Sequence, residues 1–353
     1  MKITHLECWR KDLKLDEPYT IAYETVDTSP NVFLRLQTVS GLLGWGCATP
    51  DLEVTGETTE SVLSVFQQTI EPYLRGKSPF QFARITDELR KLIPSHPSAL
   101  AMVDMALYDL VGKKAQVPLY QILGGYRDSI PTSITIGILS VPETVEKARQ
   151  FIGAGFTILK IKGGSNVEED IEKINKVREA VGPGVELRFD ANQGYSVEQS
   201  VQFIRGTQVA GIELLEQPTA RENESLMGEV SQRISVPVMA DESLMTLKDV
   251  FRLSSNNYTD MINIKLMKVG GITEGMHINS VAKSAGIEAM VGCMDESALG
   301  IAAGLHFALS RPNILYADLD GHFDVVDDPF AGMIRLEKGV LYPSELPGLG
   351  WKE

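Results

Sequence analysis

Cysteine is scarce in this sequence, which has only three among 353 residues, at Cys8, Cys47 and Cys293. They lie far apart and form no Cys-x-x-Cys pair, and they are too few for a disulfide framework. A chain that does not depend on disulfides suits a reducing compartment. We therefore expect a cytoplasmic protein.

Basic residues are also in short supply, because 33 Lys and Arg face 47 Asp and Glu, which gives a formal charge of −14. Nucleic acids and anionic membranes bind proteins through a basic face, so we expect neither as a partner. No run of about 18 uncharged apolar residues occurs, and the N-terminus MKITHLECWRKDLKLDEP has no apolar core of a signal peptide. The sequence predicts neither export nor membrane insertion.

The first part of the chain combines strand and helix signals. With 43 % apolar and 23 % charged residues, the chain has the composition of a globular protein with a sizeable core. Extended segments are expected at 3–9, 31–38 and 42–46, with a turn at Ser40-Gly41, and helical periodicity follows over 59–74, 82–93 and 98–115. This pattern is typical of a compact α+β domain, which we place at residues 1–125.

From about residue 130, short β-rich runs alternate with helical stretches, the pattern of repeated βα units. We predict eight strands, at Thr132–Ile138, Thr157–Lys162, Val185–Asp190, Ile212–Glu216, Val236–Asp241, Met261–Lys265, Glu288–Cys293 and Ile314–Asp318. Eight parallel strands joined by helices close into a barrel. The fold class predicted is α/β, with a TIM-like barrel over 126–321. Residues 322–353 show little periodicity and are expected to return to the first domain.

Charged residues end five consecutive predicted strands of the barrel, the second to the sixth. They are Lys160 and Lys162 in LKIKGG, Asp190 in FDANQ, Glu216 in LLEQP, Asp241 in MADES and Lys265 in NIKLMK. Successive members of this set, from Lys162 through the three acids to Lys265, are 24 to 28 positions apart, close to the length of one βα repeat. The C-terminal ends of barrel strands are where such folds carry their chemistry. We expect these side chains to surround one mouth.

Asp190, Glu216 and Asp241 come from three adjacent strands and offer a hard, oxygen-rich site. Such a site suits Mg²⁺, with the remaining positions left to water or substrate. One acid alone would as readily be a surface residue, but three at matched strand ends favour a metal. We predict one Mg²⁺ per subunit, and we expect the neighbouring Asn192 and Glu242 to support the ligands.

The three lysines suggest acid–base chemistry. Alternation along a strand puts Lys160 and Lys162 on the same face, whereas Lys265 enters from the opposite side of the metal. A lysine is a base only when neutral, so we expect a neighbouring ammonium and a divalent cation to lower its pKa. Lys160 is then the electrostatic neighbour of Lys162, or else it forms a structural ion pair with one of the carboxylates.

The motifs LKIKGG, DANQGY, LLEQP, MADES, NIKLMKVGG and GCMDES together resemble those of dipeptide epimerases of the enolase superfamily, in the muconate-lactonizing subgroup. The resemblance spans essentially the whole chain. It implies a capping domain over a (β/α)7β barrel, Mg²⁺ on Asp190, Glu216 and Asp241, and Lys162 with Lys265 as the acid–base pair. A lysine or histidine base working with magnesium is an established feature of that superfamily rather than a deduction of ours.

The implied reaction inverts the α-carbon of the C-terminal residue of an L,L-dipeptide. One lysine removes the α-proton and the conjugate acid of the other returns a proton to the opposite face. The ene-diolate between these steps carries two charged oxygens, which magnesium stabilises. The resemblance therefore names a small dipeptide as the substrate, and we also expect a homo-oligomer.

A pair of aspartates, Asp318 and Asp320 in ADLDG, ends the eighth predicted strand. In the resembled epimerases this D-x-D pair holds the dipeptide's α-ammonium, and two close carboxylates require a cation. Read as a bare motif, D-x-D is also a common solvated turn. Thr135 matches a family position that lines the substrate carboxylate, beside Lys160, although a buried threonine often only satisfies a local hydrogen bond.

Acidic residues recur in the segments that correspond to the family's specificity loops. They are Glu24 in DEPYTIAYET, Asp51 and Glu53 in ATPDLEVTGET, and Asp295 and Glu296 in GCMDES. Related enzymes acting on a terminal glutamate would present a cation there, but the one arginine between Lys14 and Pro50 is Arg35, within a predicted strand. We therefore predict a preference for basic side chains in the dipeptide. The alternative is that these acids merely face water.

Two kinds of rival remain. An o-succinylbenzoate synthase, a cycloisomerase or an N-acylamino-acid racemase would use the same lysines and metal, but their substrates have no free α-ammonium for Asp318 and Asp320. A non-catalytic metal- or peptide-binding protein could also keep the fold. The presence of both lysines and all three carboxylates argues against this second rival.

Overall fold

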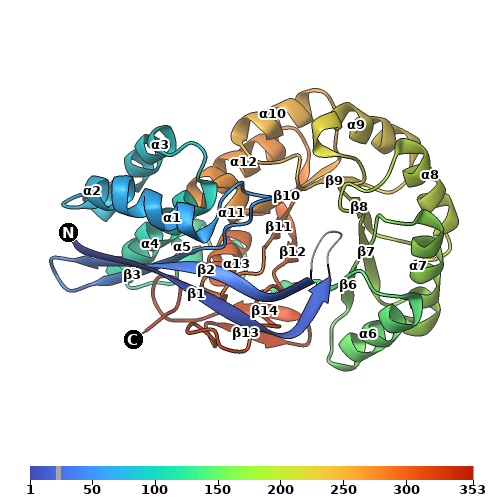
Figure 1. The fold of residues 1–353 in the computed structure, drawn as a ribbon, viewed down its shortest axis with the longest axis horizontal. Helices are drawn as coiled ribbons and strands as arrows, with labels where there is room; N and C mark the ends of the chain where they lie inside the picture. Colours follow the sequence, from blue (N-terminus) through green and yellow to red (C-terminus); the bar gives the residue numbers. More distant parts are fainter. Residues whose placement is uncertain (21–24, 353) are drawn as a thin grey trace.

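The computed structural model describes residues 1–20 and 25–352, in which an N-terminal α+β part lies beside a barrel (Figure 1). The N-terminal sheet has three antiparallel strands in the order β1-β2-β3, namely β1 (Ile3–Thr20), β2 (Thr25–Thr38) and β3 (Leu43–Ala48). Strand β1 is longer than the predicted extended segment 3–9. The charged stretch KDLKLDEP carries a weak strand signal, but its backbone pairs with β2 and Leu15 bridges Val325, so tertiary partners make it a strand.

Helices follow this sheet in the chain. They are α1 (Thr59–Val65), η1 (Phe66–Ile70), α2 (Glu71–Leu74), η2 (Pro79–Gln81), α3 (Phe82–Leu92), α4 (Pro97–Ala115) and α5 (Leu119–Leu123), of which α1 and α4 pack on the strands. The helix predicted over 59–74 is interrupted by the π-helical turn η1, where the Glu71 N–H bonds to the Phe66 carbonyl. Pro72 follows at once and has no N–H to continue a regular α-helical ladder. No helix in the part of the chain that the structure describes is long and apolar enough to cross a membrane.

Helix α4 lies at the junction of the two parts and is buried along most of its length. It packs on β3 on one side and on α11 of the barrel on the other. Gly46 of β3 permits the close approach, because a Cβ there would collide with the backbone oxygen of Met102. One side of α4, with Met105 and Tyr108, therefore belongs to the core of the barrel, whereas the other side, with Met102 and Leu107, belongs to the core of the N-terminal part.

Eight parallel strands form the second part, in the unbroken order β5 to β12. They are β5 (Ile134–Ile136), β6 (Ile158–Lys162), β7 (Glu186–Asp190), β8 (Leu214–Glu216), β9 (Val238–Ala240), β10 (Met261–Lys265), β11 (Glu288–Gly292) and β12 (Ile314–Asp318). The first and last strands are tied by the Ser133 N–H, which donates to the Ala317 carbonyl at 3.1 Å. The predicted strands coincide with these, so the TIM-like fold class is confirmed.

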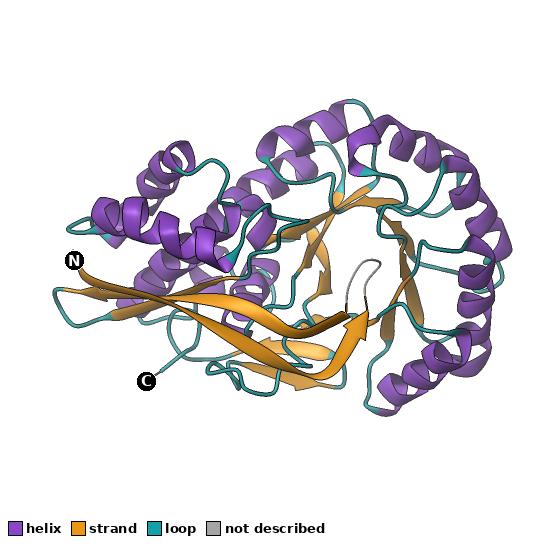
Figure 2. Cartoon of the chain, in the orientation of Figure 1, coloured by secondary structure: helices purple, strands orange, loops and turns teal. Residues whose placement is uncertain are grey.

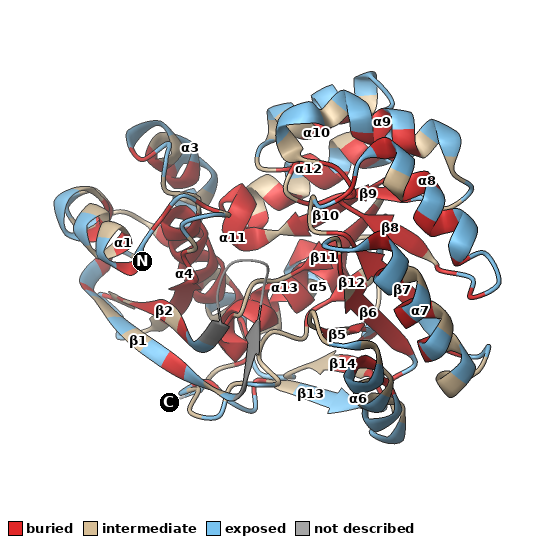
Figure 3. Ribbon diagram, turned by 45° about the vertical axis from the view of Figure 1, so that its right-hand side comes forward, coloured by how far each residue is buried: buried red, intermediate tan, exposed pale blue. Residues whose placement is uncertain are grey.

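A helix follows every barrel strand except the last (Figure 2). The connections contain α6 (Val141–Gly153), α7 (Val167–Val181), α8 (Val197–Gly206), η3 (Arg221–Asn223), α9 (Glu224–Arg233), α10 (Leu247–Ser255), α11 (Leu266–Val269), α12 (Ile272–Ser284) and α13 (Ala298–Ser310). Ser140, Ser196 and Thr246 begin α6, α8 and α10 with capping boxes. Figure 3 shows the barrel strands largely buried and the outer faces of α6 to α10 exposed, whereas α11 and α13 are buried along their length.

The C-terminal segment contacts both parts. Strands β13 (Ile334–Glu337) and β14 (Val340–Pro343) form a small sheet with β4 (Ile130–Pro131) at the start of the barrel. Phe330 packs on Phe33 and Trp45 of the N-terminal sheet, with ring centroids 5.2 and 5.4 Å apart. The segment thus ties the N-terminal part to the barrel.

Candidate active site

Three carboxylates meet at the C-terminal edge of the barrel sheet. Asp190 ends β7, Glu216 ends β8 and Asp241 follows β9, so parallel pairing brings their backbones to one level. All three side chains are buried, and their oxygen atoms lie within 4.8 Å of one another. Buried like charges at this spacing repel unless a cation joins them. This group can bind a metal ion.

The donor chemistry fits a hard divalent cation. All three side chains offer carboxylate oxygens, the ligands that Mg²⁺ prefers. Oε2 of Glu242, beside Asp241, is buried without a hydrogen-bond partner among the described residues, and Glu216 Oε2 has the Lys160 ammonium 2.9 Å away. Buried carboxylate oxygens without donors are rare unless an ion satisfies them. The residues present therefore suit magnesium.

Lys160 lies at the centre of this cluster. Its Nζ is 2.9 Å from Glu216 Oε2, 3.1 Å from Asp190 Oδ2 and 2.9 Å from Asp318 Oδ2. Burial alone would lower the pKa of this ammonium, but the carboxylates, Asp318 and Glu216 foremost, raise it well above its ordinary value. The structure thus pairs Lys160 with three acids, where the sequence suggested one at most. Lys160 is a fixed positive charge here.

The acids of the cluster titrate differently. Burial, together with the charges of the nearby acids, raises the pKa of Glu216 to about 8 against the opposing attraction of Lys160. Asp241 would also be raised by burial, but Lys265 and Lys268 hold its pKa below the ordinary value. The lysines therefore favour the ionised form of Asp241 most strongly.

Lys162 and Lys265 stand on opposite sides of the three carboxylates. Strands β6 and β10 are separated in the sheet by β7, β8 and β9, which is half of an eight-strand barrel. Lys162 ends β6 two residues after Lys160, is half-buried, and has no ion-pair partner among residues 1–20 and 25–352. Such an arrangement can present one amine to each face of a molecule bound over the carboxylates.

Lys265 is paired with one of the predicted metal ligands. Its Nζ lies 2.7 Å from Asp241 Oδ2 and its side chain is 14 % exposed. Burial alone would lower the pKa of Lys265, but the Asp241 carboxylate raises it. The lowered pKa predicted for a catalytic lysine depends on a bound divalent cation, which would compete with this ammonium for Asp241, so it stays a prediction.

Sequence reasoning missed three buried polar side chains that orient the carboxylates. The Lys268 ammonium bonds both the carboxylate and the carbonyl oxygen of Asp241. Asn263 Nδ2 donates to Glu216 Oε1 at 2.8 Å, and Gln217 Oε1 accepts the Asp241 N–H at 2.9 Å. Asn263 precedes Lys265 by two residues, so strand alternation could have found it. Lys268 reaches the site only because α11 starts immediately after β10.

The D-x-D pair already has partners within the protein. Asp318 accepts from Ser133 Oγ at 2.6 Å as well as from Lys160, and Lys160 lowers its pKa against the effect of burial. Asp320 Oδ2 accepts the Thr135 N–H at 2.7 Å, and burial raises the pKa of Asp320 to about 6, helped by the neighbouring Asp318. Asp320 is half-buried at the barrel mouth, so of the two it is the more accessible to a ligand.

Acids of the predicted specificity loops occupy different environments. Glu296 is 2 % exposed, and burial raises its pKa to about 8. Asp295 is half-buried in the same loop. Asp51 Oδ1 accepts the N–H groups of Glu53 and Val54 at 2.8 Å, so it closes a turn, and the Glu53 side chain is exposed. Glu24 lies outside the described residues.

The two residues expected to support the metal ligands adjoin them directly. The Asn192 N–H donates to Asp190 Oδ1 at 2.9 Å, from a left-handed backbone conformation with φ of 42°. Burial raises the pKa of Glu242 to about 7, and the charges of Asp241 and Asp190 act in the same direction. Asn192 thus contacts the site through its backbone.

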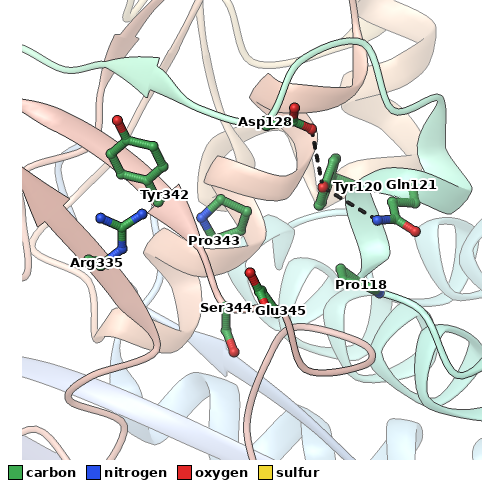
Figure 4. Close-up of a pocket in the computed structure, with 9 residues that line it drawn as sticks. All are labelled: Pro118, Tyr120, Gln121, Asp128, Arg335, Tyr342, Pro343, Ser344 and Glu345. Atoms are coloured by element: carbon green, nitrogen blue, oxygen red, sulfur yellow. Dashed lines mark hydrogen bonds between the residues drawn. The ribbon is translucent and has the colours of Figure 1, made fainter.

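A cavity of about 420 Å³ lies elsewhere, between α5 and the C-terminal segment (Figure 4). Figure 4 shows Arg335 beside Tyr342 and the Tyr120 hydroxyl bonded to Asp128. None of its lining residues is a predicted site residue. The charged strand ends are therefore the candidate site.

Residues 4–124 match the family model described as "Mandelate racemase / muconate lactonizing enzyme, N-terminal domain". Residues 143–352 match the one described as "Enolase C-terminal domain-like". The chain belongs to the mandelate racemase and muconate lactonizing enzyme family of the enolase superfamily. The predicted membership of that superfamily is confirmed.

Relatives with known activities extend over the full length. An L-Lys-D/L-Arg epimerase from Desulforapulum autotrophicum is 42 % identical over 353 residues, covering 100 % of this chain and 99 % of the relative. A dipeptide epimerase from Enterococcus faecalis, solved with Mg and L-Leu-L-Tyr, is 38 % identical with a TM-score of 0.96, covering 99 % of both chains. One from Methylococcus capsulatus, solved with Mg and L-Arg-D-Lys, is 38 % identical with a TM-score of 0.95 and the same coverage. The predicted similarity to dipeptide epimerases, which are isomerases, is confirmed.

Proposed function

We propose that the protein is a magnesium-dependent dipeptide epimerase, an isomerase that inverts the α-carbon of the C-terminal residue of an L,L-dipeptide. One observation carries the proposal: three buried carboxylates lie between lysines on opposite strands of the barrel, β6 and β10. An activity that swaps a proton from one face of a carbon to the other needs two such groups. The epimerase relatives of this chain support the same assignment.

The proposed mechanism assigns each lysine a task. Either Lys162 or Lys265, in its neutral form, removes the α-proton from one face, and the ammonium of the other donates a proton to the opposite face. Lys160, held by three carboxylates, contributes a fixed positive charge near the substrate carboxylate. Magnesium held by Asp190, Glu216 and Asp241 would supply positive charge where negative charge develops on oxygen. Asn192 and Glu242 would help to hold those ligands.

The substrate is proposed to bind by its two charged ends. Asp318 and Asp320 would receive the α-ammonium, with Asp320 as the more accessible carboxylate. Lys160 and Thr135 would line the carboxylate end, next to the proton that is exchanged. This orientation places the C-terminal residue of the dipeptide between Lys162 and Lys265.

We further propose a preference for basic side chains. Asp295, Glu296, Asp51, Glu53 and Glu24 would supply negative charge around the side chains of the dipeptide. Of these, Asp295 and Glu296 belong to a loop that follows barrel strand β11. The L-Lys-D/L-Arg epimerase relative and the relative solved with L-Arg-D-Lys support this preference.

A mass-spectrometric screen of L,L-dipeptides for α-deuterium incorporation in D₂O tests both proposals. We expect exchange that requires Mg²⁺ and is faster for L-Lys-L-Lys than for L-Ala-L-Glu. Faster exchange of L-Ala-L-Glu would end the basic preference but leave the epimerase assignment. Absence of exchange across the library would end the assignment itself.

The D-x-D pair separates the epimerase from other enzymes on the scaffold. In a variant carrying Asp318→Ala and Asp320→Ala, we expect KM for a dipeptide to rise about a hundredfold, because a charged group loses its partners. An o-succinylbenzoate synthase, a cycloisomerase or an N-acylamino-acid racemase would keep its activity, since its substrate has no α-ammonium. Full activity of the variant on an N-acylated amino acid would favour those rivals.

We also propose a cellular location, a domain division and an oligomeric state. Three free cysteines and the charge of −14 favour a cytoplasmic protein without nucleic-acid partners. The contacts of the C-terminal segment favour division into residues 1–125, 126–321 and 322–353. A homo-oligomer is proposed, and light scattering of the purified protein tests it.

A further inference from the structure

Asn31 of β2 is fully buried, and its side chain connects segments far apart in the sequence. Asn31 Oδ1 accepts from Thr49 Oγ1 at 2.8 Å and from the Ser297 N–H at 3.2 Å. Asn31 Nδ2 donates to Ser29 Oγ at 2.9 Å and to the Asp295 carbonyl oxygen at 3.4 Å. One amide therefore uses both its acceptor and its donors to join the N-terminal sheet to the barrel.

Each joined segment leads into a proposed specificity loop. Thr49 lies two residues before Asp51, which begins the turn that carries Glu53. Asp295 and Ser297 flank Glu296 in the loop between β11 and α13, at the barrel mouth. Asn31 thus stands where the two acidic loops meet.

A second residue supports this junction from the other side. Asp328 of the C-terminal segment accepts from Ser297 Oγ at 2.8 Å and from the Ala298 N–H at 2.5 Å. Ser29 Oγ also donates to the Asp295 carbonyl oxygen, as Asn31 does. The start of α13 is therefore held by strand β2 and by the segment after the barrel. Within residues 1–20 and 25–352, the side-chain hydrogen bonds of Asn31 reach Ser29, Thr49, Asp295 and Ser297, and none reaches the lysines or carboxylates of the proposed site.

Only an amide satisfies this environment. An aspartate at position 31 would lose the donors that reach Ser29 and the Asp295 carbonyl, and would set a charge against that oxygen. An alanine would leave the Ser297 N–H without its acceptor and would remove one of the two side-chain donors to the Asp295 carbonyl, which lets the loop move. The chemistry of the junction thus specifies asparagine.

We infer that Asn31 is a positioning residue that sets side-chain selectivity, by holding the Asp295–Ser297 loop and the Asp51–Glu53 turn at a fixed separation. The inference rests on the proposed epimerase function and names the structural device behind its selectivity. Because the proton-transfer groups lie on β6 to β10, loss of Asn31 alters substrate binding more than the exchange step.

The test compares Asn31→Ala and Asn31→Asp with Asn279→Ala, a buried asparagine of α12 that bonds to Asn313. Exchange of L-Lys-L-Lys and L-Ala-L-Glu in D₂O gives KM and kcat for each. We expect both Asn31 variants to raise KM for the preferred dipeptide roughly tenfold with kcat within about twofold, and to shrink its advantage over the other dipeptide. We expect Asn279→Ala to keep the wild-type ratio of kcat/KM between the two dipeptides.

Amide hydrogen exchange of the intact protein supplies a second readout, independent of activity. We expect the backbone amides of residues 293–298 and 49–55 to exchange faster in the Asn31 variants and at the wild-type rate in Asn279→Ala. Ser29→Ala, which removes the other donor to Asp295, gives a smaller effect of the same kind and serves if Asn31→Ala does not fold. Because Ser29 and Asn31 share an acceptor, their double variant deviates from additivity.

Two results overturn the inference while leaving the proposed function intact. One is that folded Asn31 variants or, if these do not fold, Ser29→Ala keep the wild-type ratio of kcat/KM between the two dipeptides. The other is a fall in kcat at constant KM. If the wild-type protein exchanges no dipeptide at all, the proposed function fails first and the selectivity role fails with it.

Discussion

The acids of the barrel and those of the N-terminal part occupy contrasting environments. Asp190, Glu216 and Asp241 are each at most 1 % exposed and lie among buried lysines. In the N-terminal part, Asp51 closes a turn and the Glu53 side chain is exposed. Charges act strongly where water is excluded and weakly where it screens them. We therefore expect the chemistry to be concentrated in the barrel and the charges of the N-terminal part to act weakly.

The barrel acids and the acidic loops also differ in what holds them in place. Barrel carboxylates are fixed by side chains from the same barrel, such as Asn263 and Lys268. The acidic loops depend on contacts between the two parts, through Asn31 and through Arg221, whose Nη1 donates to the Glu53 carbonyl at 3.3 Å. Substitutions should accordingly affect rate in the barrel and selectivity at the junction.

The largest expected effect follows from removing an acid–base group. Lys265→Met should reduce dipeptide exchange by about a thousandfold, because one face loses its proton donor or acceptor. The measurement is deuterium incorporation in D₂O, with Mg²⁺ binding followed by calorimetry to show that the carboxylates remain. Retention of more than a tenth of the activity would contradict the assignment of Lys265.

Lys268→Met tests whether a barrel side chain outside the reacting groups matters. The Lys268 ammonium bonds both the carbonyl oxygen and Oδ1 of Asp241, so its loss should weaken Mg²⁺ binding by about 10- to 100-fold. Calorimetric titration with Mg²⁺ measures this without any substrate. Lys248→Met, on the exposed face of α10, is the matched control, and equal affinities in both variants would show that Lys268 is only a packing residue.

Glu296 provides a prediction on pH. Its pKa is raised from 4.5 to about 8 by burial, so the folded protein keeps a proton that the unfolded chain releases. This group's contribution to stability is present at low pH and is lost as pH rises from about 4.5 to 8. Glu296→Gln should remove the dependence, so its stability relative to wild type should improve by a few kcal/mol, in order of magnitude, between pH 5 and pH 8. Denaturant unfolding at both pH values checks the sign, and a constant difference would refute it.

The smallest effect is expected in the N-terminal part. Glu53→Gln should change KM for L-Lys-L-Lys by less than about threefold, because an exposed charge is screened by water and salt. The assay is run at low and high salt, and the difference should disappear at high salt. An effect of tenfold or more would mean that Glu53 becomes buried against the substrate.

Much of the barrel could be predicted from the sequence, for a local reason. Alternating apolar runs mark the strands, and in parallel strands the residue that ends each run lies at the same edge as its neighbours, so Asp190, Glu216 and Asp241 had to converge. The pairing of β1 beyond Trp9 was not predictable, because its charged stretch becomes a strand only against β2 and residue 325.

What the sequence by itself determined is the barrel, the positions of its charged strand ends and the membership of the superfamily. Tertiary structure alone decided that Lys160 is shared by three acids, that Lys268 returns to Asp241 after the turn into α11, and that Asn31 joins two loops. The physical reason is range. Periodicity records which face of an element is buried, whereas a hydrogen bond between residues 31 and 297 depends on how the finished elements pack.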